Sequence, residues 1–265
     1  MPTFYEIYND EALLERLDQG CVPRGDESLI ARLKKEAGSR FKSPSLRVVD
    51  IGCGEGIHTQ NLASAFPRAM VAGIEPDETI LASARDLLQP ELKDRVSFLP
   101  GTIEAMPFHD ASTDIIWCFD MLCHVADLEA ALSECRRILR PGAAMVLCSS
   151  VITPVMDPFT WQDLSPIGLV KNSMSAETIR NAAIASGFEI VEEDNRRSEF
   201  LEAIEKEDPG RVSQDFMRYA RLLRASEYWE KIIGRERVVL LKALMGYNWA
   251  ILTGRLDYYV WWLRS

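Results

Sequence analysis

Residues 48–63, VVDIGCGEGIHTQNLA, contain an apolar run, an acid and glycines at three alternate positions, Gly52, Gly54 and Gly56. The apolar run is typical of a buried strand, and the residues after the glycines continue with the spacing of a helix. Glycine turns between a strand and a helix hold nucleotide-like ligands, because a residue without a side chain lets the backbone lie against the ligand. The stretch therefore predicts the first strand and helix of an α/β domain, with a ligand at the turn between them.

The acids beside the turn distinguish between two kinds of ligand. A dinucleotide fingerprint, G-x-G-x-x-G, requires a glycine at position 57, where this chain has Ile57. The carboxylates of Asp50 and Glu55 would also repel a pyrophosphate. S-adenosylmethionine (SAM) has no phosphate, and its sulfonium and ammonium groups are attracted to carboxylates. The turn therefore favours SAM over a dinucleotide such as NAD.

A further acid, Glu75, ends the second predicted strand, residues 69–75. In this position a carboxylate can accept hydrogen bonds from both hydroxyls of an adenosine ribose. Such an acid occurs in NAD and SAM sites alike, so Glu75 indicates an adenosine without choosing between the two ligands. The alternative is an ordinary solvated strand end.

From about residue 45 the chain alternates strand-like and helix-like segments, the pattern of a parallel sheet with helices on both faces. The expected strands span residues 46–51, 69–75, 96–99, 114–119, 143–150, 188–194 and 257–263. The expected helices span residues 57–66, 78–88, 127–139 and 176–186. Asp77 is a plausible N-cap of the second helix, and RPG at 140–142 should end the third and turn the chain.

Two segments lie outside this pattern. Residues 1–40 are expected to form an N-terminal helical lid, and residues 197–253 a long helical insertion before the last strand. A segment of that length inside a sheet connection is more often a functional cover than a plain loop. The predicted organisation is a lid (1–40), a SAM-binding core (41–196), a substrate-lid insertion (197–253) and the last core strand (254–265).

Composition restricts the class of partner. The formal net charge is −10, from 40 acids and 30 bases, and no basic patch stands out, which argues against nucleic acid. The apolar-looking run ALMGYNWAILTG near the end is too short to span a bilayer. The first residues carry acids where a secretory signal would have a basic segment. We therefore expect a small-molecule partner, no membrane span and a cytoplasmic location.

Cysteines and histidines give no sign of a metal site. The six cysteines form no C-x-x-C pair, and they are expected to be reduced thiols in the cytoplasm. The three histidines, at positions 58, 109 and 124, lack the clustering of zinc ligands. We therefore predict that no metal is bound.

Four stretches in a fixed order carry a family resemblance: VVDIGCGEG (48–56), GIEP (73–76), GTIEAMPFHDASTDIIWCFDMLCHV (101–125) and RRILRPG (136–142). Together they resemble the class I SAM-dependent methyltransferases, and most closely the small-molecule branch that includes the ubiquinone and menaquinone methyltransferases. The resemblance covers about residues 45–150. It implies an α/β, Rossmann-like sheet of seven strands, the last one antiparallel, with SAM across the carboxyl ends of the first strands.

The resemblance also implies roles for individual residues. Asp50, Gly52 and Gly54 would line the methionine half of SAM. Glu75 would bind the ribose, and Pro76 would lie beside the adenine. Transfer of the methyl group would leave S-adenosylhomocysteine (SAH) as the product of the cofactor.

One position departs from the family pattern. Thr102 stands where the family commonly has an acid that accepts from the adenine amino group. A threonine hydroxyl accepts this hydrogen bond more weakly than a charged group does. Ile103 would still offer its backbone N–H to an adenine ring nitrogen, and Phe119 and Asp120 would border the methyl donor. The departure bears on the adenine contacts and not on the choice of cofactor.

His124 follows the fourth predicted strand, and the resemblance implies that it lies near the methyl acceptor. Because imidazole titrates near neutral pH, His124 is the candidate general base. The alternative is a structural role, in which it caps a helix or positions backbone. Methyl transfer from a sulfonium needs a base only if the acceptor loses a proton, so an O, N or C acceptor stays open.

Aromatic and apolar side chains gather in the segments expected to overhang the acceptor. They are Tyr5 and Tyr8 near the start, Met156, Phe159 and Trp161 after the fifth strand, and Tyr219 and Tyr228 in the insertion. For each of them ordinary core packing is the alternative. Together they predict a small, largely apolar or aromatic metabolite in an enclosed pocket, in secondary or cofactor metabolism.

Three rival classes stand beside this interpretation. A SAM-binding protein that does not catalyse would have the same binding turn. An NAD-linked oxidoreductase is disfavoured by Asp50 and Ile57. A nucleic-acid methyltransferase is disfavoured by the net charge and by CFDM at 118–121, where enzymes that methylate base amines carry N-P-P-[YF].

Overall fold

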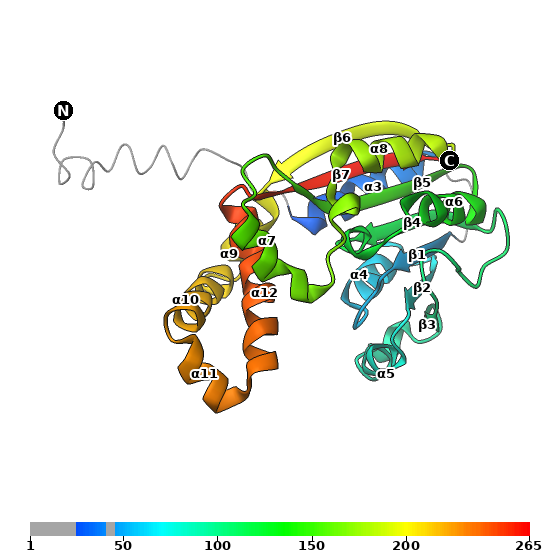
Figure 1. Cartoon of the computed structure of the whole chain (residues 1–265). Helices are drawn as coiled ribbons and strands as arrows, with labels where there is room; N and C mark the ends of the chain where they lie inside the picture. Colours follow the sequence, from blue (N-terminus) through cyan, green and yellow to red (C-terminus); the bar gives the residue numbers. More distant parts are fainter. Residues whose placement is uncertain (1–24, 41–45) are drawn as a thin grey trace, which may run out of the picture.

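The computed structural model describes residues 25–40 and 46–265, in which seven strands form one sheet of order β3-β2-β1-β4-β5-β7-β6 (Figure 1). The strands are β1 Arg47–Ile51, β2 Met70–Glu75, β3 Val96–Pro100, β4 Thr113–Phe119, β5 Leu139–Ile152, β6 Glu189–Arg197 and β7 Leu256–Arg264. Neighbouring strands from β3 to β5 pair in parallel, and β7 is antiparallel to both β5 and β6. The predicted seven-stranded, Rossmann-like fold is confirmed.

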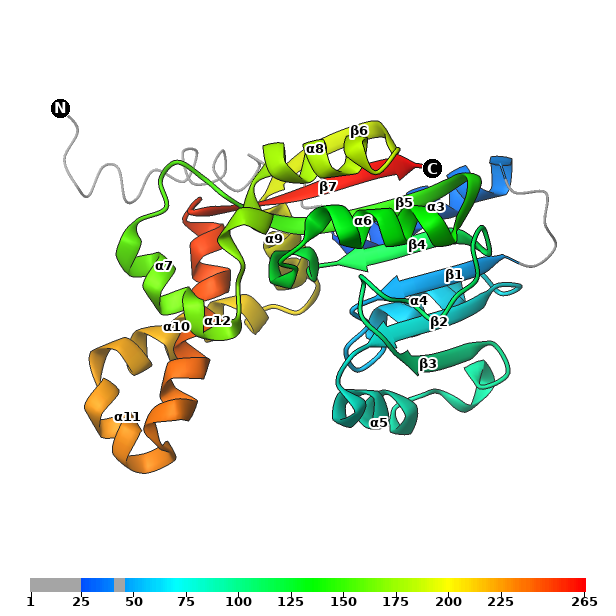
Figure 2. The same ribbon diagram turned by 45° about the vertical axis from the view of Figure 1, so that its right-hand side comes forward.

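Helices cover both faces of the sheet (Figures 1 and 2). One face carries α3 Asp26–Arg40, α4 Ile57–Ala65 and α5 Glu78–Asp86, and the other carries α6 Leu128–Ile138 and α8 Ala176–Ala185. Alternate residues of a strand point to opposite faces. Ile115 and Trp117 of β4 therefore join the core under α3 and α4, whereas Ile116 and Cys118 join the core under α6 and α8.

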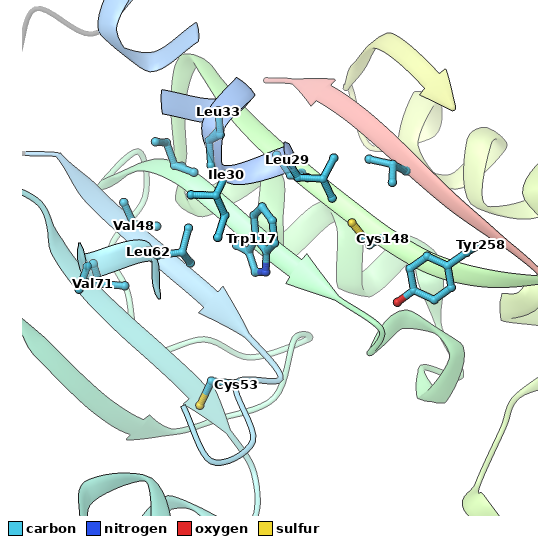
Figure 3. Close-up of a cluster of buried hydrophobic side chains, with 14 of the residues drawn as sticks. Leu29, Ile30, Leu33, Val48, Cys53, Leu62, Val71, Trp117, Cys148 and Tyr258 are labelled. Atoms are coloured by element: carbon cyan, nitrogen blue, oxygen red, sulfur yellow. The ribbon is translucent and has the colours of Figure 1, made fainter. Parts of the chain in front are cut away.

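The first described helix, α3, packs on the sheet. Leu29 and Leu33 are buried in the same core as Trp117, and Figure 3 shows these side chains together. The described part of the predicted N-terminal lid thus belongs to the hydrophobic core, while Tyr5 and Tyr8 lie outside the described residues. The division of the chain into lid, core and insertion stays a prediction.

Local sequence signals account for most element boundaries. The side chains of Asp77 and Asp127 accept hydrogen bonds from backbone N–H groups in the first turns of α5 and α6, as N-caps do. As predicted, α6 ends directly before RPG at 140–142, but β5 starts earlier than predicted, at Leu139, which pairs with Thr113 across an irregularity in the ladder. The next pair is Ile115 with Ala144, so residues 140–143 have no partner in β4, and Gly142 there has φ +77°.

The residues between β6 and β7 form helices, which we call the helical cover: α9 Glu199–Glu207, α10 Arg211–Arg224, α11 Ser226–Ile233 and α12 Arg235–Leu252. The cover extends from the edge of the sheet at which β1 and β4 end (Figure 2). Beside α12 lies α7 Pro158–Leu164. Short 3-10 helices are η1 Pro90–Leu92, η2 Leu122–His124, η3 Ser165–Ile167 and η4 Lys171–Met174. Across residues 25–40 and 46–265, no helix has the length and apolar character needed to cross a bilayer.

Candidate active site

The glycine turn after β1 is held against the end of β2. The backbone N–H groups of Gly52 and Cys53 donate to the carbonyl oxygen of Ile74 at 2.8 and 3.0 Å. Gly52 has φ +70°, a conformation that favours glycine, and a Cβ there would lie 2.5 Å from Cγ of Met121. Position 52 therefore requires glycine for both backbone conformation and space.

A cleft of about 310 Å³ opens at this edge of the sheet. Its lining residues are Ile51, Gly52, Ile74, Glu75, Pro76, Gly101, Thr102, Ile103, Glu104, Met121, His124 and Val125. The structure thus brings together five residues predicted to hold SAM, from the ends of three neighbouring strands. Among the described residues, two carboxylates and no lysine or arginine line the cleft, which suits a ligand that carries positive charge and no phosphate.

The carboxylate of Glu75 lies at the cleft with one oxygen engaged by backbone. Its Oε1 accepts a hydrogen bond from the backbone N–H of Asp77 at 3.2 Å, and its side chain is half-buried at the cleft. No hydrogen bond to Oε2 occurs within the described residues, so this oxygen can accept from a ribose hydroxyl.

Asp50 lies behind the turn and does not line the cleft. It is 2% exposed, and its Oδ2 accepts a hydrogen bond from the hydroxyl of Thr59 at 2.6 Å. Burial raises the pKa of Asp50 to about 7, although the hydrogen bonds from Thr59 act in the opposite direction. Thr59 was not singled out in the sequence, yet it lies in the first turn of the helix after the glycines, where its side chain can reach back to the strand.

Phe119 is part of an aromatic cluster beside the turn. It stacks on His58 with ring centroids 4.6 Å apart, and its ring centroid lies 5.2 Å from that of Phe200 on α9. Burial lowers the pKa of His58, whose Nδ1 lies 3.5 Å from Oδ2 of Asp26 at the start of α3. The cluster therefore joins α3, α4, β4 and the helical cover on one side of the cleft.

Asp120 follows β4 in a left-handed conformation, with φ +52°. Its Oδ1 accepts a hydrogen bond from the hydroxyl of Tyr247, on α12, at 2.7 Å. That hydroxyl also lies 2.7 Å from Oγ of Ser150. Burial raises the pKa of Asp120 above its ordinary value, and the hydrogen bond from Tyr247 opposes this change.

A second cavity of about 680 Å³ lies beyond Asp120. Its lining residues are Asp120, His124, Pro166, Ile167, Gly168, Leu169, Leu240, Leu244 and Tyr247. Leu240 and Leu244 are 46% and 50% exposed, so this side of the cavity is open to solvent. His124 lines both this cavity and the cleft next to Glu75.

The tautomer of neutral His124 follows from one contact. Its Nδ1 lies 3.3 Å from the carbonyl oxygen of Gly168. Because a carbonyl oxygen only accepts hydrogen bonds, Nδ1 carries the proton when this bond forms. In the neutral ring Nε2 then has the free lone pair, which is the form a general base needs.

The residues predicted to contact substrate lie elsewhere. None of Met156, Phe159, Trp161, Tyr219 and Tyr228 lines the second cavity. Phe159 and Tyr228 are 81% and 59% exposed, while Met156 and Trp161 pack against the core under α3 and α4. These five assignments stay predictions.

The wall of the second cavity contains residues that sequence reasoning missed. Leu240, Leu244 and Tyr247 occupy positions i, i+4 and i+7 of α12 and therefore share one helix face. That spacing was visible in the sequence, but it did not indicate what the face would meet.

The described residues contain no group of three or more His, Cys, Asp or Glu side chains able to hold a metal ion.

Comparison with known proteins identifies the class of domain. Residues 49–147 match a family model described as a methyltransferase domain. These residues are a methyltransferase domain of the class I SAM-dependent type, and SAM is the cofactor of this class.

Among similar proteins, methyltransferase GfsG of Streptomyces halstedii is 31% identical over 67% of this chain and 61% of its own length. The 27-O-demethylrifamycin SV methyltransferase of Amycolatopsis mediterranei is 29% identical over 63% of this chain and 57% of its own length. The chain thus spans less than two thirds of these relatives.

Solved structures share the fold. A sarcosine dimethylglycine methyltransferase from Galdieria sulphuraria, itself described as putative, superposes with a TM-score of 0.67 at 19% identity over 89% of this chain and 84% of its own. The [4+2]-cyclase SpnF superposes with a TM-score of 0.61 at 20% identity over 88% of this chain and 80% of its own.

Proposed function

We propose that this chain transfers a methyl group from SAM to a small, largely apolar or aromatic metabolite. The observation that carries the proposal is the position of His124, which lines both the cleft beside Glu75 and the second cavity. The cleft is assigned to SAM and the second cavity to the acceptor. A methyl donor in one and an acceptor in the other would meet beside this histidine.

The protein's part in the reaction is to position the acceptor and to take a proton. SAM, when bound, supplies a methyl group activated by its positively charged sulfur. The acceptor atom forms a bond to the methyl carbon while the carbon–sulfur bond breaks and its electron pair stays on sulfur, which leaves SAH. His124 takes the acceptor proton at Nε2. Positioning in line can contribute about 7–11 kcal/mol to lowering the barrier.

The lining of the second cavity supports the substrate class. Ile167, Leu169, Leu240 and Leu244 give it apolar walls, while the polar groups gather at the end near Asp120. A metabolite with an apolar body suits these walls, because burial of its surface drives binding. The two named bacterial relatives and the rifamycin compound in one name favour secondary metabolism. The five described cysteines are free and buried, which is in keeping with a cytoplasmic location.

A SAM-binding protein that does not transfer methyl groups is the second candidate. The observation that favours it is the neighbour SpnF, which is named as a [4+2]-cyclase although it shares this fold. The sheet and glycine turn alone therefore do not determine the reaction.

The test uses the purified chain with methyl-labelled SAM and a panel of apolar alcohols, phenols, amines and carboxylic acids. We expect SAM and SAH, but not NAD, to raise the melting temperature, since a ligand at about a hundred times its Kd adds ~2.7 kcal/mol. Label should then pass to at least one acceptor. Binding of SAM without transfer to any acceptor would favour the second candidate. Stabilisation by NAD alone would overturn both.

A further inference from the structure

The carboxylate of Asp120 has no lysine or arginine partner among the described residues. The hydroxyl of Tyr247 donates a hydrogen bond to it, and the hydroxyl of Tyr258 and the rings of His58 and His124 also lie close enough to lower its pKa. A buried carboxylate without a lysine or arginine partner is costly. Asp120 also has φ +52°, an uncommon conformation for a residue with a side chain. A carboxylate with this energetic cost in the wall of a cavity is a candidate for binding a ligand.

Two tyrosines and a serine surround this carboxylate. Tyr247 has one hydroxyl proton, which it donates to the charged Asp120, so Ser150 is the donor in the contact between Ser150 and Tyr247. Tyr258 is 3% exposed, and its hydroxyl makes no hydrogen bond with the described residues. In Figure 3 this hydroxyl points toward the carboxyl end of β4, which Asp120 follows. Asp120 and Tyr247 thus form a polar end of the cavity, and Ser150 and Tyr258 lie behind them outside its lining.

The remaining wall is of the opposite character. Pro166, Ile167 and Leu169 come from the segment at η3, and Leu240 and Leu244 come from α12. The cavity of about 680 Å³ therefore has one anionic end and an apolar body that opens to solvent. Apolar walls discriminate only weakly between ligands of similar size. A single charged group in such a cavity selects ligands by the charge of their polar group.

We propose that Asp120, oriented by Tyr247, is a specificity-determining residue that binds a protonated amine on an otherwise apolar acceptor. The inference rests on the proposed function, because it assigns the second cavity to the acceptor. It places the ammonium of the acceptor against the carboxylate and its apolar body along Leu240 and Leu244. The methylated atom lies on the His124 side of the same cavity.

The sulfonium of SAM is the competing cation. Asp120 lines the second cavity and not the cleft that contains Glu75, so the geometry favours the acceptor side. Comparing the affinities for SAM and SAH distinguishes binding of the acceptor ammonium from binding of the sulfonium, since SAM carries the positive sulfur and SAH does not. A carboxylate facing the sulfonium would bind SAM better than SAH, and its neutralisation would remove that difference.

The experiment compares 2-phenylethylamine with 2-phenylethanol, which share one apolar body and differ in charge. Binding of each is measured by ligand-observed NMR titration, with and without SAH. The wild-type protein should bind the amine roughly tenfold or more tightly than the alcohol, as a charge-assisted hydrogen bond predicts. Asp120→Asn should abolish this preference and leave SAH affinity unchanged. Asparagine tolerates a left-handed backbone, so the variant should keep the turn.

Asp163→Asn is the matched control, because Asp163 is an exposed aspartate of α7 that lines neither cavity. It should keep the full preference for the amine. Tyr247→Phe, which retains the charge of Asp120, should reduce the preference without abolishing it. Melting curves of all three variants establish that each is folded.

Equal binding of amine and alcohol by the wild-type protein would overturn the inference, as would an Asp120→Asn variant that keeps the preference. A loss of SAM affinity without a loss of SAH affinity in Asp120→Asn would place the carboxylate on the cofactor side and also overturn it. Failure of the wild-type protein to bind SAM or SAH would contradict the proposed function. An amine preference that depends on Asp120 would still support the inference in that case.

Discussion

The hydroxyl of Tyr247 lies 2.7 Å from Oδ1 of Asp120, although the two residues are 127 positions apart in the chain. Asp120 follows β4 and lines the second cavity, and Tyr247 belongs to the helical cover. One hydrogen bond thus ties the cover to the centre of the proposed active site.

Tyr247→Phe should loosen the helical cover. Removal of the hydroxyl breaks the bond to Asp120, and a single hydrogen bond to a charged group is worth about 1.5–3 kcal/mol. We expect a lower melting temperature and faster amide hydrogen exchange in α12. Tyr228→Phe, which alters an exposed tyrosine on α11, is the control and should change neither. Unchanged exchange in α12 of the Tyr247 variant would mean that packing alone holds the cover.

Glu75→Ala should weaken SAM binding by about 1.5–3 kcal/mol, the value of charge-assisted hydrogen bonds to the ribose. Isothermal titration calorimetry with SAM and SAH measures the loss, which should be similar for both because they share the ribose. The control is Glu78→Ala, since Glu78 is an exposed acid of α5 that pairs with Arg85. If the Glu75 variant binds with wild-type affinity, the ribose lies elsewhere.

His124→Ala should reduce turnover about 100-fold or more, because general-base catalysis contributes roughly 10²–10⁴-fold. SAM affinity should stay nearly unchanged, and the comparison needs single-turnover rates with an acceptor identified in the panel. His109→Ala, in an exposed loop, provides the matched control. Turnover close to wild type in the His124 variant would assign this histidine a structural role.

Asp50→Asn should make the free protein more stable above pH 7. Burial raises the pKa of Asp50 to about 7 in the folded state, well above its value of about 4 in an unfolded chain. Between these values the folded protein holds a proton that the unfolded chain has lost, so the wild-type free energy of unfolding falls as pH rises through this range. Each unit of pKa difference corresponds to about 1.4 kcal/mol.

Asparagine has no proton to lose, so the stability advantage of Asp50→Asn should grow from pH 4 to pH 7 and then level off. Thermal melts at pH 5 and pH 8 measure it, with the exposed Asp94→Asn as control. SAM affinity at pH 8 should fall in the Asp50 variant, as the family role of this acid predicts. A pH-independent difference between the two proteins would show that Asp50 does not titrate in this range.

Gly52→Ala should destabilise the protein more than Gly142→Ala does. The two glycines have nearly the same backbone, with φ +70° and +77°, so the conformational penalty of about 1–2 kcal/mol is shared. Only at Gly52 would the new Cβ meet a neighbour, Cγ of Met121 at 2.5 Å, whereas nothing lies within 4 Å at Gly142. Chemical denaturation measures the difference. Equal losses would mean that Met121 moves aside at no cost.

The course of the sheet could be predicted because its signals are local. Apolar runs ended by glycine or an N-cap predict strands and helices, and Asp77 and Asp127 cap the helices that follow them. Glu75 could be placed at the cleft because a residue at the end of a parallel strand must lie at the carboxyl edge of the sheet. The extra pairing that starts β5 at Leu139 could not be predicted, because it depends on the partner strand.

Sequence patterns were thus enough to predict the Rossmann-like sheet, the glycine turn and five residues that meet at the cleft beside Glu75. The tertiary structure alone decided which side chains form the second cavity. In the folded chain Tyr247, Leu240 and Leu244 line this cavity, whereas Phe159 and Tyr228 are exposed elsewhere. The physical reason is range: strand ends and caps depend on neighbours along the chain, whereas the contact of Tyr247 with Asp120 depends on how α12 packs against the end of β4.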